Sequence, residues 1–236
     1  MPDTRSHRGP HPEDRGLFAP AALPVLRDTV DDLCWLVSRG YATPGALKLV
    51  GDRHQLAARQ RMAVGRAACS NEARSARLQR RVDPADARGR PLALDGFNLL
   101  TTVEVALSGG LVLACRDETD RDIAGMHGTY RRVEETRPAL VLIGQTLAEL
   151  QTAQCCWFLD RPVSNSGRLR TLMLAVAAEH AWPWTVELAF SPDRAVCEAS
   201  MVVVSADSAV LDRCGPWLNL AREVVARAPA AWRVAL

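Results

Sequence analysis

The sequence predicts an α/β domain with a mainly parallel sheet, preceded by a small all-helical and basic domain. Two observations support this prediction. Up to about residue 80 the apolar residues have only helical spacing, whereas the remainder alternates short apolar runs with helical patterns. Such alternation is typical of buried strands joined by crossover helices. A chain of 236 residues, 48% hydrophobic and 24% charged, is an ordinary globular protein of one or two domains, which excludes the disordered classes.

The N-terminal part is predicted to be helical. Residues 1–16 are polar and rich in Pro, Gly and Arg, which indicates a flexible arm or an extended lead-in. Within the helical domain, 17–82, the apolar residues over 23–37 have helical spacing, and the Ala-, Arg- and Gln-rich stretch after Gly51 favours further helices. The Pro- and Gly-containing segment 80–91 is expected to be a linker.

The α/β domain is predicted to cover residues 90–236. Its expected strands are the short apolar runs at 91–95, 111–115, 155–160, 185–190 and 201–207. Its expected helices are the amphipathic stretches at 97–108, 138–150, 165–180 and 207–226. The order alternates strand and helix, so the strands are expected to run mainly parallel.

The charge is unevenly distributed along the chain. The net charge is only +2, but residues 51–90 contain ten arginines against four acids. This segregation favours contacts with the phosphates of a nucleic acid, for which Arg53, Arg59 and Arg61 are candidates. A solvated helical face is the alternative, because arginine-rich helices are frequent in chains of this composition.

The cysteines and the N-terminus predict a cytoplasmic protein. The seven cysteines are odd in number, lack C-x-x-C spacing and lie mostly in apolar runs, so we expect reduced core thiols. The N-terminus has no apolar stretch resembling a signal peptide, and no window is apolar enough for a membrane span. We therefore expect no membrane partner.

Three of the apolar runs are followed by an aspartate. Asp95 and Asp160 close their predicted strands, and Asp207 comes just past the end of a third. The carboxyl ends of parallel strands meet at one edge of a sheet, where ligands bind, so the three carboxylates are expected to converge. Converging carboxylates repel one another unless a cation neutralises them, and Mg²⁺ or Mn²⁺ prefers such oxygen-rich sites. Each aspartate taken alone could instead cap a helix or turn.

Further acids are weaker candidates for the same site. Asp117 follows the run at 111–115, and Asp212 lies five residues beyond Asp207, where it reaches the edge only if the helix begins late. Glu104 falls on the helix after Asp95, and a helical glutamate is most often solvated.

The segment after Asp160 offers groups for a phosphate. Ser164, Asn165 and Ser166 open a predicted helix whose free N–H groups suit an anion, and Arg168 adds charge. The alternative is an ordinary helix cap. Asn98, three residues after Asp95, could orient a phosphate or water or could also cap. Tyr130 could stack a base or belong to the core.

The motifs carry two resemblances. "LDGFNLL" resembles the opening motif of the PIN/NYN-like nucleases, and "WFLD" and "VVVSADS" are similar to later strand-end acids of that superfamily. The whole chain also resembles an uncharacterised prokaryotic family of two joined domains, domains of unknown function 434 and 5616. The first resemblance implies a three-layer α/β/α PIN-like fold over about 90–225, with a metal-dependent ribonuclease site at Asp95, Asp160 and Asp207.

These observations lead to a functional hypothesis with two alternatives. The leading hypothesis is a Mg²⁺- or Mn²⁺-dependent nuclease, with RNA as the expected substrate and the three aspartates as metal ligands. Many such nucleases carry a second aspartate where this chain has Ala209, and Asp212 could substitute for it. The second hypothesis is therefore a catalytically inactive RNA-binding or adaptor module. The third is a metal-dependent phosphatase acting on small substrates.

Overall fold

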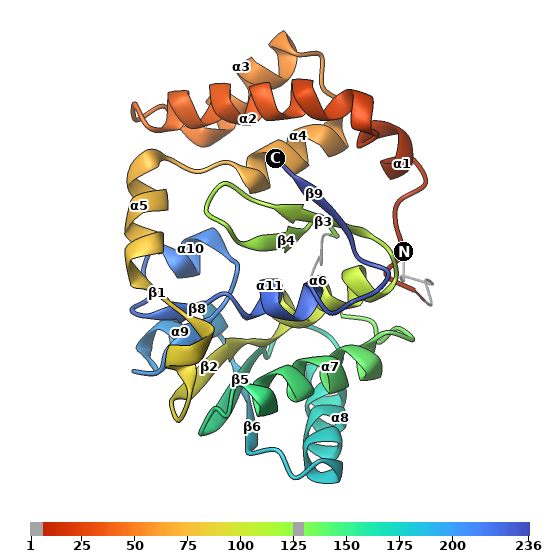
Figure 1. The fold of residues 1–236 in the computed structure, drawn as a ribbon, viewed down its shortest axis with the longest axis vertical. Helices are drawn as coiled ribbons and strands as arrows, with labels where there is room; N and C mark the ends of the chain where they lie inside the picture. Colours follow the sequence, from red (N-terminus) through yellow and green to blue (C-terminus); the bar gives the residue numbers. More distant parts are fainter. Residues whose placement is uncertain (1–6, 125–129) are drawn as a thin grey trace.

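A six-stranded sheet in which all strands run parallel forms the lower part of the molecule (Figure 1). The computed structural model describes residues 7–124 and 130–236. The strands, in their order across the sheet, are β1 (Arg81–Val82), β8 (Trp217–Leu218), β7 (Val202–Val204), β2 (Pro91–Asp95), β5 (Gln154–Asp160) and β6 (Trp184–Ala189). β2 lies between β7 and β5, so the chain extends the sheet first on one side of β2 and later on the other.

Helices cover both faces of this sheet. One face carries α6 (Gly96–Leu107), α7 (Thr136–Glu149), α8 (Ser166–Glu179) and α11 (Leu220–Val225), and the other carries α9 (Pro192–Glu198) and α10 (Ser208–Leu211). In β2, Leu92 and Leu94 pack into the first face, and Ala93 packs into the second. The strand is buried on both sides, which explains its continuous apolar sequence. The predicted α/β fold with a helical N-terminal region is confirmed, and its layering is α/β/α.

A second sheet of three strands lies above the first (Figure 1). β3 (Leu111–Ala114) is central, antiparallel to β4 (Asp120–Asp122) and parallel to β9 (Trp232–Ala235). The sequence had placed the run at 111–115 in the main sheet and had not indicated β4 or β9. The reason is that β3 is itself buried on both faces, so its apolar pattern matches that of a central strand of the main sheet.

The N-terminal helices pack on the second sheet. They comprise α1 (Asp14–Leu17), η1 (Pro20–Ala22), α2 (Leu23–Val37), α3 (Thr43–Arg53), α4 (Ala58–Ala67) and α5 (Asn71–Arg80). Their core residues, such as Leu33 and Val64, form one hydrophobic cluster with Leu111 and Leu113 of β3. A short turn, η2 (Pro84–Ala87), joins α5 and β1 to β2. The helices and the second sheet therefore share a single core.

Residues 7–16 are packed against the body of the molecule. Arg8 is only 6% exposed, and its Nε lies 2.9 Å from Oε2 of Glu104 in α6. Asp14 is fully buried and is bound by the guanidinium of Arg59 in α4. The expectation of a flexible arm therefore fails for residues 7–16, because two buried ion pairs hold them; residues 1–6 lie outside the described part of the chain.

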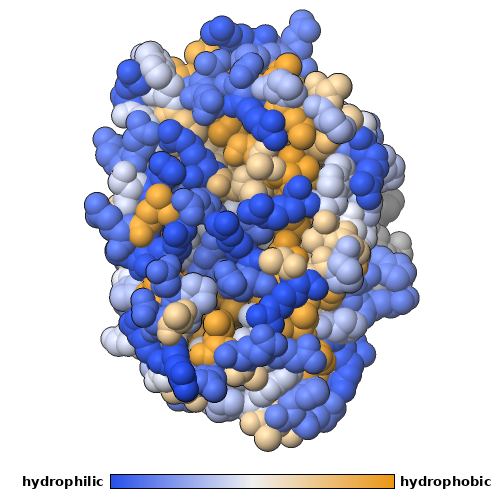
Figure 2. Space-filling model, in the orientation of Figure 1, coloured by the Kyte–Doolittle hydropathy of each residue, from blue (hydrophilic) through white to orange (hydrophobic). Residues whose placement is uncertain are grey.

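The surface agrees with an ordinary globular composition. Hydrophilic residues predominate on the face shown in Figure 2, and apolar residues appear in patches among them. In the part of the chain that the structure describes, no helix is long and apolar enough to cross a membrane. All seven cysteines lie in that part and are free, and only Cys197 is not fully buried.

Candidate functional site

A polar pocket of about 250 Å³ opens at the carboxyl edge of the six-stranded sheet. We call it the acid pocket. It is lined by Arg66, Asp95, Phe97, Asn98, Thr101, Asp122, Ala124, Asp160, Asp193 and Asp207. Five of these ten residues are aspartates, so the pocket concentrates negative charge.

Four of the aspartates come from four adjacent strands. Asp95 is the last residue of β2 and Asp160 the last of β5, whereas Asp207 follows β7 and Asp193 follows β6. β7, β2, β5 and β6 are consecutive neighbours in the sheet, so their ends deliver the carboxylates side by side. The convergence of Asp95, Asp160 and Asp207 on one pocket follows the sequence expectation. After β2 the chain adds β5 and β6 on one side of this strand and then β7 and β8 on the other. Open α/β sheets bind ligands at the carboxyl end of the strands where the strand order reverses in this way.

Ser205 and Asn98 hold the β7–α10 connection against the end of β2. The Ser205 hydroxyl donates to Oδ2 of Asp95 at 2.8 Å and accepts from the backbone N–H of Asp207 at 3.0 Å. The side-chain oxygen of Asn98 accepts from the backbone N–H of Ala206 at 2.9 Å. Asn98 therefore positions the loop that carries Asp207, a role that its predicted cap or phosphate contact did not include.

The glycine after Asp95 is required by a close approach. A Cβ atom on Gly96 would lie 2.5 Å from a methyl carbon of Leu159 and 2.9 Å from the carbonyl oxygen of Phe158. Both distances are far below a normal contact, so a larger residue would push α6 away from β5. The Asp-Gly pair thus lets the end of β2 sit against the end of β5, beside Asp160.

The capping alternatives are resolved differently for the three predicted aspartates. Asp207 does cap α10, since its Oδ1 accepts from the N–H groups of Ala209 at 2.7 Å and Val210 at 3.2 Å. Asp95 occupies the N-cap position of α6 without a side-chain cap hydrogen bond. Asp160 ends β5 six residues before α8 begins. One of the three carboxylates therefore serves a cap through one oxygen, and capping does not explain the other two.

The electrostatics of the pocket disfavour ionisation of its most buried acids. Burial raises the pKa of Asp95 to about 7; the hydrogen bond from Ser205 opposes this rise, and the carboxylates of Asp193 and Asp207 add to it. Burial and the charge of Asp193 also raise the pKa of Asp160. The carboxylates thus repel one another, which is the condition that a bound cation relieves.

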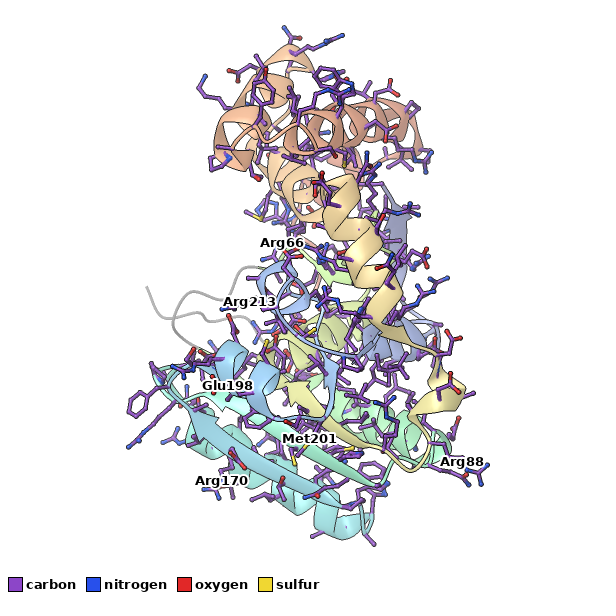
Figure 3. The ribbon with its side chains drawn as sticks, turned by 90° about the vertical axis from the view of Figure 1, so that its left-hand side faces the viewer. Arg66, Arg88, Arg170, Glu198, Met201 and Arg213 are labelled. Atoms are coloured by element: carbon purple, nitrogen blue, oxygen red, sulfur yellow. The ribbon has the colours of Figure 1, made fainter. Side chains whose placement is uncertain are left out.

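Three charged residues of the pocket were not among the predicted site residues. Asp193 is the second residue of α9, after the loop that follows β6, and Asp122 and Arg66 come from β4 and the end of α4. Figure 3 shows Arg66 where the N-terminal helices face α10. The only signal for Asp193 was its place shortly after a predicted strand.

Asp122 is already saturated by the protein. Its Oδ2 accepts from the Thr102 hydroxyl at 2.8 Å and its Oδ1 from the backbone N–H of Ala124 at 2.8 Å. Burial raises the pKa of Asp122, while the positive charge of Arg66 lowers it. Asp122 therefore belongs to the wall of the pocket, and the other four aspartates are the better donors for a ligand.

The donor set fits a hydrated divalent cation. Within residues 7–124 and 130–236, no three His, Cys, Asp or Glu side chains form a group that could hold a metal ion. Mg²⁺, however, is usually held by one or two carboxylates together with waters and substrate phosphates, and Mn²⁺ likewise prefers oxygen ligands. A polar pocket rimmed by several carboxylates suits that mode of binding, whereas a closed cage of protein ligands is not formed.

Two predicted metal ligands lie elsewhere. The guanidinium of Arg77 in α5 binds Asp117 at 2.5 Å and Asp212 at 2.7–2.8 Å, and Arg121 binds Asp117 at 2.6 Å. The two arginines are among the groups that lower the pKa of Asp117, against the effect of its burial. Neither aspartate lines the acid pocket, so Asp117 and Asp212 join α5 to the α/β part, and Asp212 does not substitute for an acid at Ala209.

Glu104 and Tyr130 are parts of a buried network. Glu104 is fully buried and accepts hydrogen bonds from Arg8, from the Tyr130 hydroxyl and from Thr136. Burial raises the pKa of Glu104, and Arg8 opposes that rise. Glu104 is thus neither solvated nor in the acid pocket, and Tyr130, 1% exposed, has the core role that was one of its two alternatives.

The candidate arginines of the basic segment are largely used inside the helical unit. Arg59 binds Asp14, and Arg61 binds Asp52 at 2.7 Å and the carbonyl of Leu56 at 2.9 Å. Arg53 is 73% exposed and lies 4.0 Å from Asp32. The charge excess that suggested nucleic-acid contacts is therefore compensated in part, because four of the ten arginines pair with acids outside the segment. Arg53, Arg59 and Arg61 do not border the acid pocket.

The segment after Asp160 has a structural and an exposed part. Ser166 is buried, and its hydroxyl donates to the carbonyls of Asp160 at 2.5 Å and Val163 at 2.6 Å, so it is not available to a phosphate. Asn165 adopts a left-handed conformation with φ of 71° and makes no side-chain cap. Ser164 and Arg168 are exposed.

Comparison with known proteins places the chain in a family. Residues 84–223, more than half of the chain, match the family model described as "Domain of unknown function (DUF5616)". The chain belongs to the DUF5616 family. Residues 25–80 match the model described as "Protein of unknown function (DUF434)". The resemblance to a family of two joined domains of unknown function is thereby confirmed.

The DUF5616 chain is also similar to a curated archaeal protein. "Uncharacterized protein MJ0935" of Methanocaldococcus jannaschii is 27% identical over 153 residues, which cover 63% of this chain and 73% of that protein. No solved structure matches the chain. Any function must therefore be argued from the geometry of the pocket itself.

Proposed function

We propose that the acid pocket is the active site of a divalent-metal-dependent nuclease that hydrolyses phosphodiester bonds in RNA. The observation that supports it is the delivery of Asp95, Asp160, Asp193 and Asp207 to one pocket by four adjacent parallel strands. The resemblance of "LDGFNLL" and "VVVSADS" to PIN/NYN-like nucleases points to the same chemistry. In that resemblance Ala209 leaves one acid missing, and Asp193, in α9 after the end of β6, offers a further carboxylate.

The protein side of the chemistry follows from the contacts. Mg²⁺ or Mn²⁺, when bound, would neutralise the carboxylates and the scissile phosphate and lower the pKa of water. Asp95 and Asp160 are the first-choice ligands because capping does not explain either carboxylate. Ser205 orients the carboxylate of Asp95, and Asp207 presents its second oxygen while its first caps α10. Arg66, which is exposed, can contact the phosphate.

The test is cleavage of a labelled single-stranded RNA with Mg²⁺ or Mn²⁺. We expect Asp95→Asn and Asp160→Asn to lose at least 100-fold in rate, on the order of the loss when an essential charged group is removed from an active site. Asp86→Asn, an exposed aspartate in η2 near the opposite edge of the sheet, is the matched control and should retain the wild-type rate. Equal rates for the wild type and Asp95→Asn would refute the proposal.

The alternative is an inactive RNA-binding or adaptor module. It is favoured by the observation that the described residues form no group of three ligands that could hold an ion. For such a module, isothermal titration with Mn²⁺ should give no heat that depends on Asp95 and Asp160. Heat that disappears in both Asp→Asn variants, but persists in Asp86→Asn, would favour the enzyme.

A further inference from the structure

A second pocket, of about 340 Å³, lies next to the acid pocket. We call it the arginine pocket. It is lined by Tyr130, Arg131, Arg132, Asn165, Arg168, Leu169 and Leu172. Two separate segments build it, residues 130–132 before α7 and the first turns of α8, so the three arginines are brought together by the fold and not by the sequence alone.

The two pockets share a wall. Phe97 lines the acid pocket and Tyr130 the arginine pocket, and their ring centroids are 5.1 Å apart. The side-chain amide of Asn165 donates to the carbonyl of Tyr130 at 3.0 Å, and Ser166 donates to the carbonyl of Asp160 at 2.5 Å. The wall between the pockets is therefore formed by two packed aromatic rings and by the connection between β5 and α8.

Two of the charges in the arginine pocket, Arg132 and Arg168, are exposed. Among residues 7–124 and 130–236, neither Arg132 nor Arg168 forms an ion pair, whereas five of the ten arginines within 17–82 do. Cations gathered in one pocket repel one another, and an anion removes that cost. The planar guanidinium group matches the oxygens of a phosphate, so a phosphate is the anion that these side chains suit.

The rest of the lining suits a flat apolar group. The apolar part of the lining consists of Leu172, which is half-buried, and of Leu169 and Tyr130, which belong largely to the core. A pocket with arginines on one side and leucines on the other can take a phosphate and a base at the same time. Nucleoside phosphates have this combination of a multiply charged group and a planar apolar ring.

We propose that the arginine pocket binds one nucleotide of a single-stranded nucleic acid, adjacent to the nucleotide whose phosphate lies in the acid pocket. The choice of a strand over a free nucleotide rests on the proposed nuclease function. A single strand is required because a base must be unstacked before it can enter a side pocket. The arginine pocket thus selects single-stranded nucleic acid, whose bases can be unstacked, for binding at the acid pocket.

The test is the binding of a fluorescent single-stranded oligoribonucleotide at several salt concentrations, in EDTA so that no cleavage occurs. The variant is Arg132→Gln with Arg168→Gln. Its control is Arg39→Gln with Arg88→Gln, which removes the same charge from exposed positions. Arg88 lies just before the amino end of β2, whereas the acid pocket opens at the carboxyl ends of the strands. Figure 3 shows Arg88 well apart from Arg66 of the acid pocket.

We expect the variant to bind at least 10-fold more weakly than the wild type. The slope of log affinity against log salt should be shallower by about 1.4, from about 0.7 for each phosphate contact to a single strand. The control should match the wild type, and the melting temperatures of all proteins should agree because the changed side chains are exposed. Equal affinity and slope in the variant and the control would overturn the inference.

Competition separates a strand from a free nucleotide. AMP and inorganic phosphate should displace the oligonucleotide only at far higher concentrations than an unlabelled oligonucleotide does, and AMP competing equally well would overturn the assignment to a strand. If the wild type cleaves RNA but the variant binds normally, the inference fails and the proposed function stands. If the wild type cleaves nothing and the variant still loses binding, the arginine pocket is supported and the nuclease proposal fails.

Discussion

Replacing Asp95 by Asn should stabilise the protein without divalent metal, by an amount that depends on pH. The carboxylate is 7% exposed and faces Asp193 and Asp207, and its pKa is raised from 3.8 to about 7. Near pH 4 the acid is largely protonated in the folded state and about half ionised in the unfolded state. Between pH 4 and 7 it ionises first in the unfolded chain, so the free energy of unfolding falls as the pH rises.

The magnitude follows from the size of the shift. About 3 pKa units at about 1.4 kcal/mol each give about 4 kcal/mol of lost stability above pH 7. This value is an upper limit because the pocket admits water. Asparagine resembles the neutral acid and can still accept the Ser205 hydrogen bond. The stability difference between Asp95→Asn and the wild type should therefore grow from near zero at pH 4 towards that limit at pH 8.

The assay is urea denaturation of both proteins in EDTA at half-unit steps from pH 4.5 to 8.5, with Asp86→Asn as the exposed control. Adding Mg²⁺ at pH 8 should stabilise the wild type more than Asp95→Asn, because the cation offsets the repulsion only where the carboxylate is present. Stability curves of the wild type and Asp95→Asn that run parallel over this pH range would refute the reasoning.

Three further predictions concern single contacts. Ser205→Ala removes a hydrogen bond that lowers the pKa of Asp95, so an NMR titration should show the Asp95 pKa rising above about 7; an unchanged midpoint would contradict the contact. Gly144→Ala should destabilise the protein by about 1–3 kcal/mol in urea denaturation, because its Cβ would lie 1.9 Å from the Trp182 ring, whereas Gly167→Ala, with no atom within 4 Å, should be neutral. Arg8→Ala leaves the buried Glu104 carboxylate without its cation and should cost about 3–5 kcal/mol, and adding Glu104→Gln should recover part of the loss; additive losses would exclude the coupling.

The convergence of Asp95, Asp160 and Asp207 could be predicted because it depends only on local patterns. Each closes or follows a short apolar run, and parallel strands bring their carboxyl ends to one edge. Asp193 and Arg66 escaped prediction because a loop and a helix end place them, and no periodicity marks either position. The sequence thus indicated the edge of the sheet but not the complete lining of the pocket.

The ion-pair partners of the basic segment escaped prediction for a different reason. Its arginines lie together in sequence, but their partners lie far away: Asp14 for Arg59, and Asp117 and Asp212 for Arg77. Net charge over a window cannot reveal such pairs, since it counts only neighbours along the chain. Arg168, outside the basic window, faces a pocket without an acid partner among the described residues.

The placement of the helical unit links its packing to the candidate site. Leu111 and Leu113 of β3 are buried in the core of the N-terminal helices, so removing those helices would expose the second sheet. The same sheet supplies Asp122 to the acid pocket, and α4 supplies Arg66. The pocket is therefore assembled between the two parts that the DUF434 and DUF5616 matches distinguish, with five aspartates from one part and the arginine from the other. A function that uses this pocket requires both parts in one chain or in close association, because neither part alone provides its full lining.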